Sequence, residues 1–149
     1  MPKNPGDKRL VFISHSSKDT WVAKQIAREV EACGATYFLD EAHAEAGTDF
    51  EEKILDSLER ADELLVLLTP WAFERPYVWA EMGAAWGRRI PIVVLLHGMT
   101  AAEIQARPDI PVFLKKRVLL DLNDIETYLR QLRVRSSAET TTRGGSTNE

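Results

Sequence analysis

The strongest constraint on the fold is the alternation of short apolar runs with segments of helical period. Five runs rich in Val, Ile, Leu and Phe lack the regular polar positions of a half-exposed strand, so they resemble strands covered on both faces. These runs are Leu10–Ser14, Thr36–Asp40, Leu64–Thr69, Ile92–His97 and Val118–Asp121. Between them, apolar residues recur every three or four positions, as in Val22, Ile26 and Val30, which indicates helices with one buried face.

The predicted helices also carry start and stop signals. Four segments place a capping side chain three residues before a carboxylate: Ser16–Asp19, Thr48–Glu51, Thr100–Glu103 and Asn123–Glu126. Gly34 and Gly87 stand where two helices should end. Strands that alternate with helices predict an α/β fold with right-handed crossovers. We therefore predict a flavodoxin-like, doubly wound sheet of five parallel strands in the order 2-1-3-4-5, with helices on both faces.

The length of 149 residues fits a single domain. We expect an N-terminal extension at residues 1–8, a folded domain at residues 9–135 and a tail at residues 136–149. The tail is rich in Ser, Thr and Gly and has almost no apolar side chains. Such a composition is typical of a disordered tail or of a linker that is cut short.

The composition argues against several functional classes. The net charge is −4 and Lys and Arg are scattered along the chain, so we expect no basic face for direct contact with nucleic acid. The apolar runs are too short to span a membrane and no signal peptide is recognisable, so we expect a cytoplasmic protein. The single cysteine, Cys33, is interpreted as a core residue. No two histidines stand at metal-ligand spacing, and neither a metal nor a cofactor is predicted.

The carboxyl ends of the strands are where an open α/β sheet binds its ligands. That edge is expected to carry Ser14, His15 and Ser16 after the first strand and Trp71 after the third. Ser16 also suits a plain helix cap, a role that is compatible with ligand contact. The long loop at residues 41–49 is rich in small residues and is suited to cover a site. The three histidines of the chain are interpreted as loop residues that face solvent.

Glu81 is the most informative residue of the sequence. It is the single charged residue within the apolar segment Tyr77–Trp86, and burial of an unpaired charge is costly. One interpretation places Glu81 in solvent or in an ion pair with a nearby arginine. The other places it in a pocket wall with Tyr77 and Trp71, two aromatic residues for which core packing is the alternative. The pattern alone leaves both interpretations open.

Four stretches, taken in their order and spacing, resemble the TIR (Toll/interleukin-1 receptor) domain from Arg9 to about Arg133. They are Val11–Ser16, Phe38–Asp40 with Glu45–Gly47, Leu65–Pro70 and Tyr77–Glu81. The chain looks most like bacterial TIR domains. Enzymatic members of the family cleave NAD at the nicotinamide–ribose bond, so the resemblance implies NAD as the substrate.

The resemblance also implies roles for particular residues. The family enzymes use a glutamate that follows an aromatic-Val pair on the helix after the third strand, and Tyr77-Val78-x-x-Glu81 has that spacing. The family often has Trp in place of Tyr77, and a small polar residue where this chain has Arg75. Glu81 is thereby implied as catalytic. The residues expected to line or border the NAD site are Ser14, His15, Ser16, Asp40, Glu45, Gly47, Trp71 and Tyr77.

Several functions remain in competition at this point. The first is an NAD nucleosidase, activated by assembly with other TIR domains or by a partner protein, as in bacterial antiviral defence. The second is a non-catalytic module, since adaptor members of the family lack the glutamate and only bind partners. A nucleoside deoxyribosyltransferase shares the fold and a catalytic glutamate. A phospho-receiver does not fit, because the third strand ends in Thr69-Pro70. Nothing in the sequence selects ADP-ribose, a cyclic product or base exchange.

Overall fold

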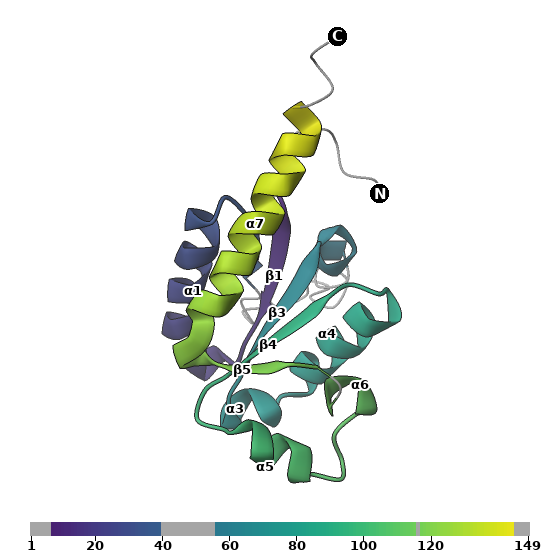
Figure 1. Cartoon of the computed structure of the whole chain (residues 1–149). Coiled ribbons are helices and arrows are strands. Elements are labelled where there is room, and N and C mark those ends of the chain that lie inside the picture. Colours follow the sequence, from purple (N-terminus) through teal and green to yellow (C-terminus); the bar gives the residue numbers. More distant parts are fainter. Residues whose placement is uncertain (1–6, 40–55, 116, 145–149) are drawn as a thin grey trace, which may run out of the picture.

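Five parallel strands form one sheet at the centre of the molecule, in the order β2-β1-β3-β4-β5 (Figure 1). The structure is a computed structural model that describes residues 7–39, 56–115 and 117–144. The strands are β1 Leu10–Ser14, β2 Thr36–Leu39, β3 Glu63–Leu68, β4 Ile92–Leu96 and β5 Leu119–Asp121. Their order and parallel pairing confirm the predicted flavodoxin-like α/β fold.

Several strand ends differ from the prediction by one residue. β3 and β4 each end one residue earlier than expected, at Leu68 and Leu96. Thr69 leaves the strand because its hydroxyl caps the next helix, where it accepts a hydrogen bond from the backbone N–H of Ala72 at 3.1 Å. β3 also begins one residue early, at Glu63, a charged residue that the apolar pattern left out and that the structure buries completely.

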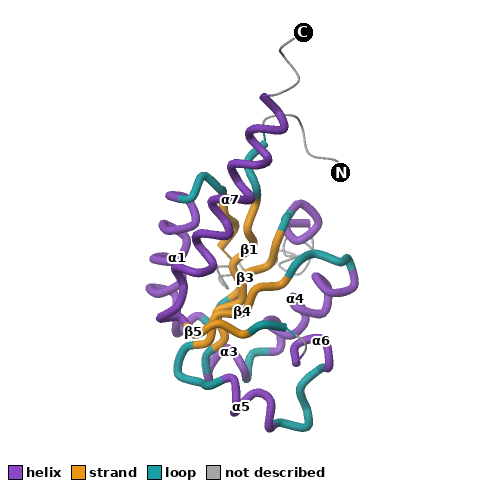
Figure 2. Tube along the Cα trace, in the orientation of Figure 1, coloured by secondary structure: helices purple, strands orange, loops and turns teal. Residues whose placement is uncertain are grey.

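Helices cover both faces of the sheet (Figure 1, Figure 2). One face carries α1 Thr20–Ala32 and α7 Ile125–Gly144. The other carries α3 Pro70–Phe73, α4 Pro76–Gly87, α5 Ala101–Ala106, α6 Val112–Lys115 and the helical residues 56–60. Two short 3-10 turns, η1 Ser17–Asp19 and η2 Leu122–Asp124, lead into α1 and α7.

Two apolar clusters fill the space between the sheet and the helices. Successive strand residues point to opposite faces, so Phe12 packs in the cluster that contains α4 residues. Val11 and Ile13 pack in the other cluster, with residues of α1 and α7. The same alternation places the side chain of Ser14 on the α4 face of the sheet. This face is the one that matters for the candidate site.

Helix α7 is longer than the sequence pattern predicts. The pattern predicts a tail without structure from residue 136, but α7 continues to Gly144. Its packing reaches Ser136, which is buried and lies 3.8 Å from the position that a Cβ would take on Gly34. An anchored helix grows by one hydrogen bond per residue without a new nucleus, so helical structure continues past the packed turns. The boundary expected at residue 135 falls inside a helix.

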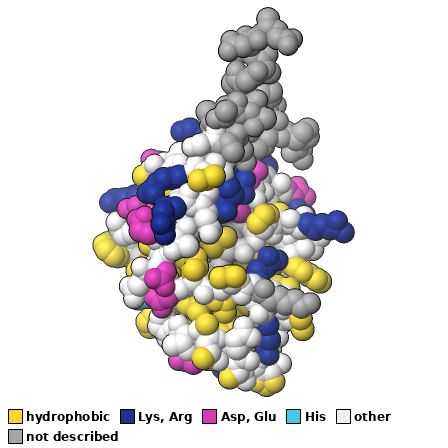
Figure 3. All heavy atoms as spheres, in the orientation of Figure 1, with side chains coloured by type: hydrophobic (Ala, Val, Ile, Leu, Met, Phe, Trp, Pro, Cys, Tyr) yellow, Lys and Arg dark blue, Asp and Glu magenta, His cyan; other side chains and the backbone are white. Residues whose placement is uncertain are grey.

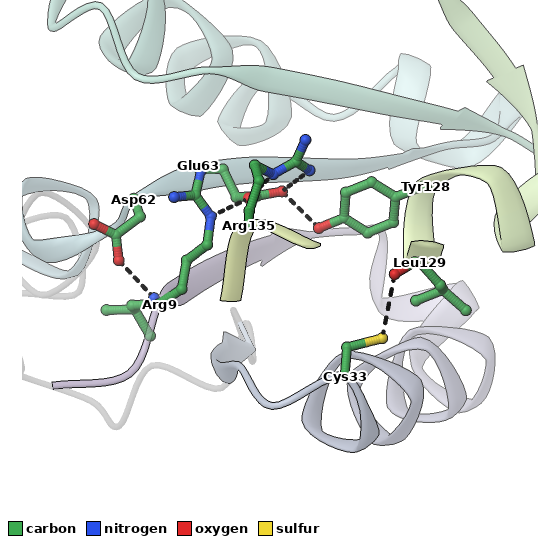
Figure 4. A network of polar contacts seen from close by, with 8 residues as sticks. Arg9, Cys33, Asp62, Glu63, Tyr128, Leu129 and Arg135 are labelled. Carbon is green, nitrogen blue, oxygen red and sulfur yellow. Dashed lines mark hydrogen bonds and ion pairs between the residues drawn. The ribbon is translucent and has the colours of Figure 1, made fainter. Parts of the chain in front are cut away.

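A buried polar network ties α7 to the amino edge of the sheet (Figure 4). The Glu63 carboxylate accepts hydrogen bonds from Arg9 Nε and from the Tyr128 hydroxyl, each at 2.6 Å. The Nε and Nη2 atoms of Arg135 each lie 3.4 Å from a Glu63 oxygen. Burial, together with the charge of Glu63, raises the pKa of Tyr128, so this hydroxyl remains a hydrogen-bond donor. The network fixes α7 at the edge opposite to the carboxyl ends of the strands.

Cys33 lies in the core at the end of α1, in agreement with its interpretation from the sequence. Its side chain packs in the cluster with α7 residues, and its Sγ donates to the backbone carbonyl of Leu129 at 3.6 Å (Figure 4). Burial raises the pKa of the Cys33 thiol. A buried thiol of raised pKa is a packing residue and not a nucleophile.

The outer surface over α7 has mixed charge. Figure 3 shows Lys and Arg side chains interspersed with acidic and apolar ones on this face of the molecule. On α7, Arg133 Nη1 lies 3.9 Å from Glu126 Oε2. Among the described residues, no helix is both long and apolar enough to cross a membrane.

Candidate functional site

The residues at the carboxyl end of β1 are buried. Ser14, His15 and Ser16 are 0%, 2% and 6% exposed. Ser16 is the N-cap of η1, and its Oγ accepts a hydrogen bond from the backbone N–H of Lys18 at 3.2 Å. Ser14 Oγ has no hydrogen-bond partner among the described residues. Buried hydroxyls are nearly always paired, so Ser14 Oγ is a candidate for contact with a ligand hydroxyl or phosphate.

The burial of His15 corrects the expectation that every histidine faces solvent. The connection from β1 to η1 consists of His15 and Ser16 alone, which holds His15 against the sheet. The backbone carbonyl of His15 also accepts a hydrogen bond from Nη1 of Arg75. His97 is exposed, as expected. His43 lies outside the described residues.

Asp19 and Thr69 join the turn after β1 to the end of β3. The Thr69 hydroxyl donates to Asp19 Oδ2 at 2.6 Å, and both residues are buried. The sequence pattern assigns Asp19 to a capping box with Ser16, but the Asp19 carboxylate bonds Thr69 instead. Since Thr69 is the N-cap of α3, this bond fixes the position of α3 relative to the turn after β1.

We expect the Thr69→Val variant to lose roughly 1 to 3 kcal/mol of unfolding free energy. Valine has the shape of threonine but removes the cap of α3 and the donor to the buried Asp19 carboxylate. Urea denaturation followed by circular dichroism measures the change. Thr69→Ser keeps the hydroxyl and should retain most of the stability. A Thr69→Val protein as stable as the wild type would contradict the importance of the bond.

Two aromatic rings stand exposed near this edge of the sheet. Trp71, in α3, is 49% exposed, and Tyr77, in α4, is 38% exposed, which excludes the core-packing alternative. The Nζ atom of Lys18 lies 5.8 Å from the centroid of the Trp71 ring. The Cζ atom of Arg75 lies 5.9 Å from the centroid of the Tyr77 ring. Exposed rings beside cations offer stacking surfaces for a flat ligand that carries negative charge.

Glu81 is buried within α4. Its residue exposure is 1%, and it lies on the helix face that also buries Val78 and Met82. The solvent-exposed interpretation is therefore wrong. Arg88, a nearby arginine, pairs with Glu59 at 3.0 Å. A buried carboxylate lies in a medium of lower dielectric than water, where its charge acts more strongly on a nearby positive centre.

Glu81 and Ser14 lie on the same side of the sheet. α4 contacts β3 and β4, and residues of α4 pack in the same core cluster as Phe12 of β1. The side chain of Ser14 lies on the same face of β1 as Phe12. α4 begins at Pro76, so Glu81 lies about 7.5 Å along the helix axis from its start, at 1.5 Å per residue. The fold thus brings a buried carboxylate and the buried polar end of β1 to one face.

The sequence singled out Glu81 and the turn after β1, whose place in the site stays a prediction, but it gave no sign of the contacts that Asp19 and Arg75 make. The bond of Asp19 was missed because the residue fits a helix-capping pattern. Arg75 was noted only as a departure from the family pattern. Asp40, Glu45 and Gly47 lie outside the described residues, so their place at the site stays a prediction. In the parts of the chain that the structure describes, no three His, Cys, Asp or Glu side chains gather as they would around a metal ion.

Comparison with known proteins identifies the family. A model of the TIR domain matches residues 11–133 of this chain. The chain belongs to the TIR domain family. The matched stretch of the TIR domain includes all the described residues that build the candidate site. No curated protein matches the chain.

Solved structures share the fold of this TIR domain at low sequence identity. The TIR domain of the Toll-related receptor TRR-2 from Hydra magnipapillata is 22% identical, with a TM-score of 0.60 over 84% of this chain and 94% of that one. TIR domains of the activated Roq1 resistosome, which recognises the pathogen effector XopQ, are 14% identical, with a TM-score of 0.56 over 91% and 84%. A 2-desoxiribosyltransferase from Leishmania mexicana is 10% identical, with a TM-score of 0.63 over 80% and 95%.

Proposed function

We propose that this TIR domain is an NAD nucleosidase that cleaves the nicotinamide–ribose bond, with Glu81 as the catalytic residue. The observation that carries the proposal is the burial of the Glu81 carboxylate, at 1% exposure, on the α4 face of the sheet. A buried carboxylate lies in a medium of low dielectric, where its charge acts strongly on a nearby positive centre. The position of Glu81 in a TIR domain, after the Tyr77-Val78 pair, supports a role in catalysis.

The chemistry suits a single carboxylate. The C–N bond breaks with its electron pair on nicotinamide, which leaves as a neutral molecule and needs no general acid, unlike the leaving group of an ordinary glycoside. The ribosyl group is left with oxocarbenium character. The Glu81 carboxylate stabilises that positive charge and can accept hydrogen bonds from the ribose hydroxyls. Water then adds to the anomeric carbon, with loss of a proton, to give ADP-ribose; attack by another nucleophile gives cyclisation or base exchange.

Residues at the carboxyl edge supply the remaining contacts in this proposal. Ser14, His15 and Ser16 line the nucleotide, with the hydroxyl of Ser14, which has no hydrogen-bond partner in the described part of the chain, as a donor on the α4 face. Trp71 and Tyr77 stack on its rings or close the site. Asp40, Glu45 and Gly47 are proposed to border it.

Assembly is the proposed mode of activation. The Roq1 resistosome supports this idea, because its TIR domains are part of an activated assembly. We propose that this domain binds other TIR domains or an activating partner, as a signalling component of bacterial defence that acts in the cytoplasm.

The direct test is nicotinamide release from NAD by the purified protein, followed by chromatography. We expect release that rises more steeply than in proportion to protein concentration, or that appears on addition of a crowding agent, because assembly is the proposed activator. Protein of confirmed fold that releases no nicotinamide at any concentration would favour a non-catalytic interaction module.

Deoxyribosyl transfer is the second candidate. The likeness to the 2-desoxiribosyltransferase, which covers 95% of that chain, favours it as the alternative. The two activities differ in substrate, because one cleaves a nicotinamide nucleotide and the other moves deoxyribose between bases. Parallel assays with NAD and with deoxynucleosides separate them: free base released from deoxynucleosides only would support the transferase.

A further inference from the structure

Arg75 is a cation that links two parts of the candidate site, the turn after β1 and the start of α4. It is the residue before α4 and adopts an extended conformation at φ −91° and ψ 115°. Its guanidinium donates through Nη1 to the carbonyl of His15, sixty positions earlier in the chain. Its Cζ atom also lies 5.9 Å from the centroid of the Tyr77 ring. One side chain thus contacts both the turn after β1 and the exposed ring at the start of α4.

We infer that Arg75 makes this site select a phosphate-bearing nucleotide over a free nucleoside, by binding the diphosphate of the ligand. The inference rests on the proposed nucleotide substrate and names the group that recognises its phosphates.

The side chain has the chemistry that this role requires. A guanidinium is always charged, is planar and has five N–H donors in a fixed fork, of which Nη1 is directed to His15. The geometry of a guanidinium matches the oxygens of a phosphate, and arginine–phosphate contacts are frequently bidentate. The bond to His15 and the contact with Tyr77 hold the side chain in place, which lowers the entropy lost when it binds a ligand.

A second pair of a cation and an aromatic ring lies near Arg75, and it also suits a nucleotide. Lys18 is a second cation at the turn after β1 and lies over the exposed ring of Trp71. Each cation therefore accompanies an exposed aromatic ring. Bases stack on rings, and phosphates bind cations, so a nucleotide satisfies both chemistries together whereas a nucleoside satisfies only the first.

Ligands that the protein does not cleave provide the test. ADP-ribose carries the diphosphate, and adenosine carries the same base and a ribose without phosphate. Calorimetric titration of the full chain should show tighter binding of ADP-ribose than of adenosine. Arg75→Gln should weaken ADP-ribose binding by about 10- to 100-fold, the range for a hydrogen-bonded charge, and leave adenosine binding within about twofold. Arg75→Lys keeps the charge and should recover part of the loss.

The matched control is Arg107→Gln. Arg107 also lies over an aromatic ring, with its Cζ atom 4.1 Å from the centroid of Phe73. Among the described residues, no hydrogen bond or ion pair found in the structure joins Arg107 to the turn after β1. This variant should bind both ligands as the wild type does. Equal weakening of ADP-ribose and adenosine by Arg75→Gln would show a purely structural role and overturn the inference, as would wild-type binding of ADP-ribose no tighter than that of adenosine.

The two proposals can fail separately. Binding that depends on Arg75 and on phosphate, in a protein that releases no nicotinamide, would support nucleotide recognition and count against the NAD nucleosidase. Nicotinamide release that is unaffected by Arg75→Gln, with unchanged ADP-ribose binding, would leave the nucleosidase in place and overturn the role of Arg75.

Discussion

Replacement of Glu81 by Gln is expected to lower the rate of nicotinamide release by a factor of ~10² to 10³, the usual loss when one preorganised stabilising group is removed. Glutamine keeps the shape of the side chain and removes its charge. The oxocarbenium-like centre then lacks the negative charge that would stabilise it. Folding should not suffer, because a neutral amide is less costly to bury than a carboxylate. Chromatography of nicotinamide, with thermal denaturation of the same samples, measures both quantities.

Glu74→Gln is the matched control for this variant. Glu74 is exposed and lies at the end of α3, seven residues before Glu81 in the chain. The Glu74→Gln substitution makes the same chemical change in the same region and leaves the buried Glu81 carboxylate in place. Nicotinamide release should therefore stay close to that of the wild type. Full activity in Glu81→Gln, or an equal loss in both variants, would refute the catalytic role of Glu81.

The Glu63→Ala variant is expected to lose about 3 to 5 kcal/mol of unfolding free energy, the range for removing one partner of a buried ion pair. Glu63 is completely buried and bonds Arg9, Tyr128 and Arg135 (Figure 4). Its removal leaves two guanidinium groups and a hydroxyl without their shared acceptor, and water reaches Arg9 and Tyr128 poorly. Urea denaturation, with the slope of the transition recorded, measures the loss.

Two further variants show whether the burial of this network causes the effect. Glu59→Ala removes the partner of Arg88 in an exposed pair at 3.0 Å and should cost less than about 1 kcal/mol. Tyr128→Phe removes one donor to the Glu63 carboxylate and should cost an intermediate amount, about 1.5 to 3 kcal/mol. If Glu63→Ala were no more destabilising than Glu59→Ala, the network would contribute nothing special to the attachment of α7.

The sheet could be predicted from the sequence because its central strands, β1, β3 and β4, are buried on both faces. All six residues of β3 are buried, so its sequence is a continuous apolar run, and turns with clear capping residues separate such runs. The exception within β3 is Glu63. An ionised residue in a strand is acceptable only if distant residues pair with it, and Arg9, Tyr128 and Arg135 are far away in the chain.

The site could be predicted only where a residue conflicts with its local pattern. Glu81 conflicts with an apolar helix, and that conflict is visible without a structure. Asp19 does not, because it fits a helix cap and its bond to Thr69 depends on how two loops meet. The contact of Arg75 with His15 likewise depends on tertiary structure. Helix α7 exceeds its predicted length because anchoring at the sheet, and not local composition, decides how far a helix continues.

Under the proposed function, strand β3 separates the residues that stabilise the fold from those that act on the substrate. Glu63 begins it and Thr69 follows its last residue, six positions and about 20 Å away at ~3.3 Å per residue. Substitutions around Glu63 should therefore change how many molecules are folded, while each folded molecule keeps its specific activity. Substitutions beyond Thr69 should change the turnover of a fully folded population. Activity divided by the folded fraction consequently distinguishes the two kinds of variant, and destabilised proteins with lesions at the amino edge should be rescued by stabilising osmolytes.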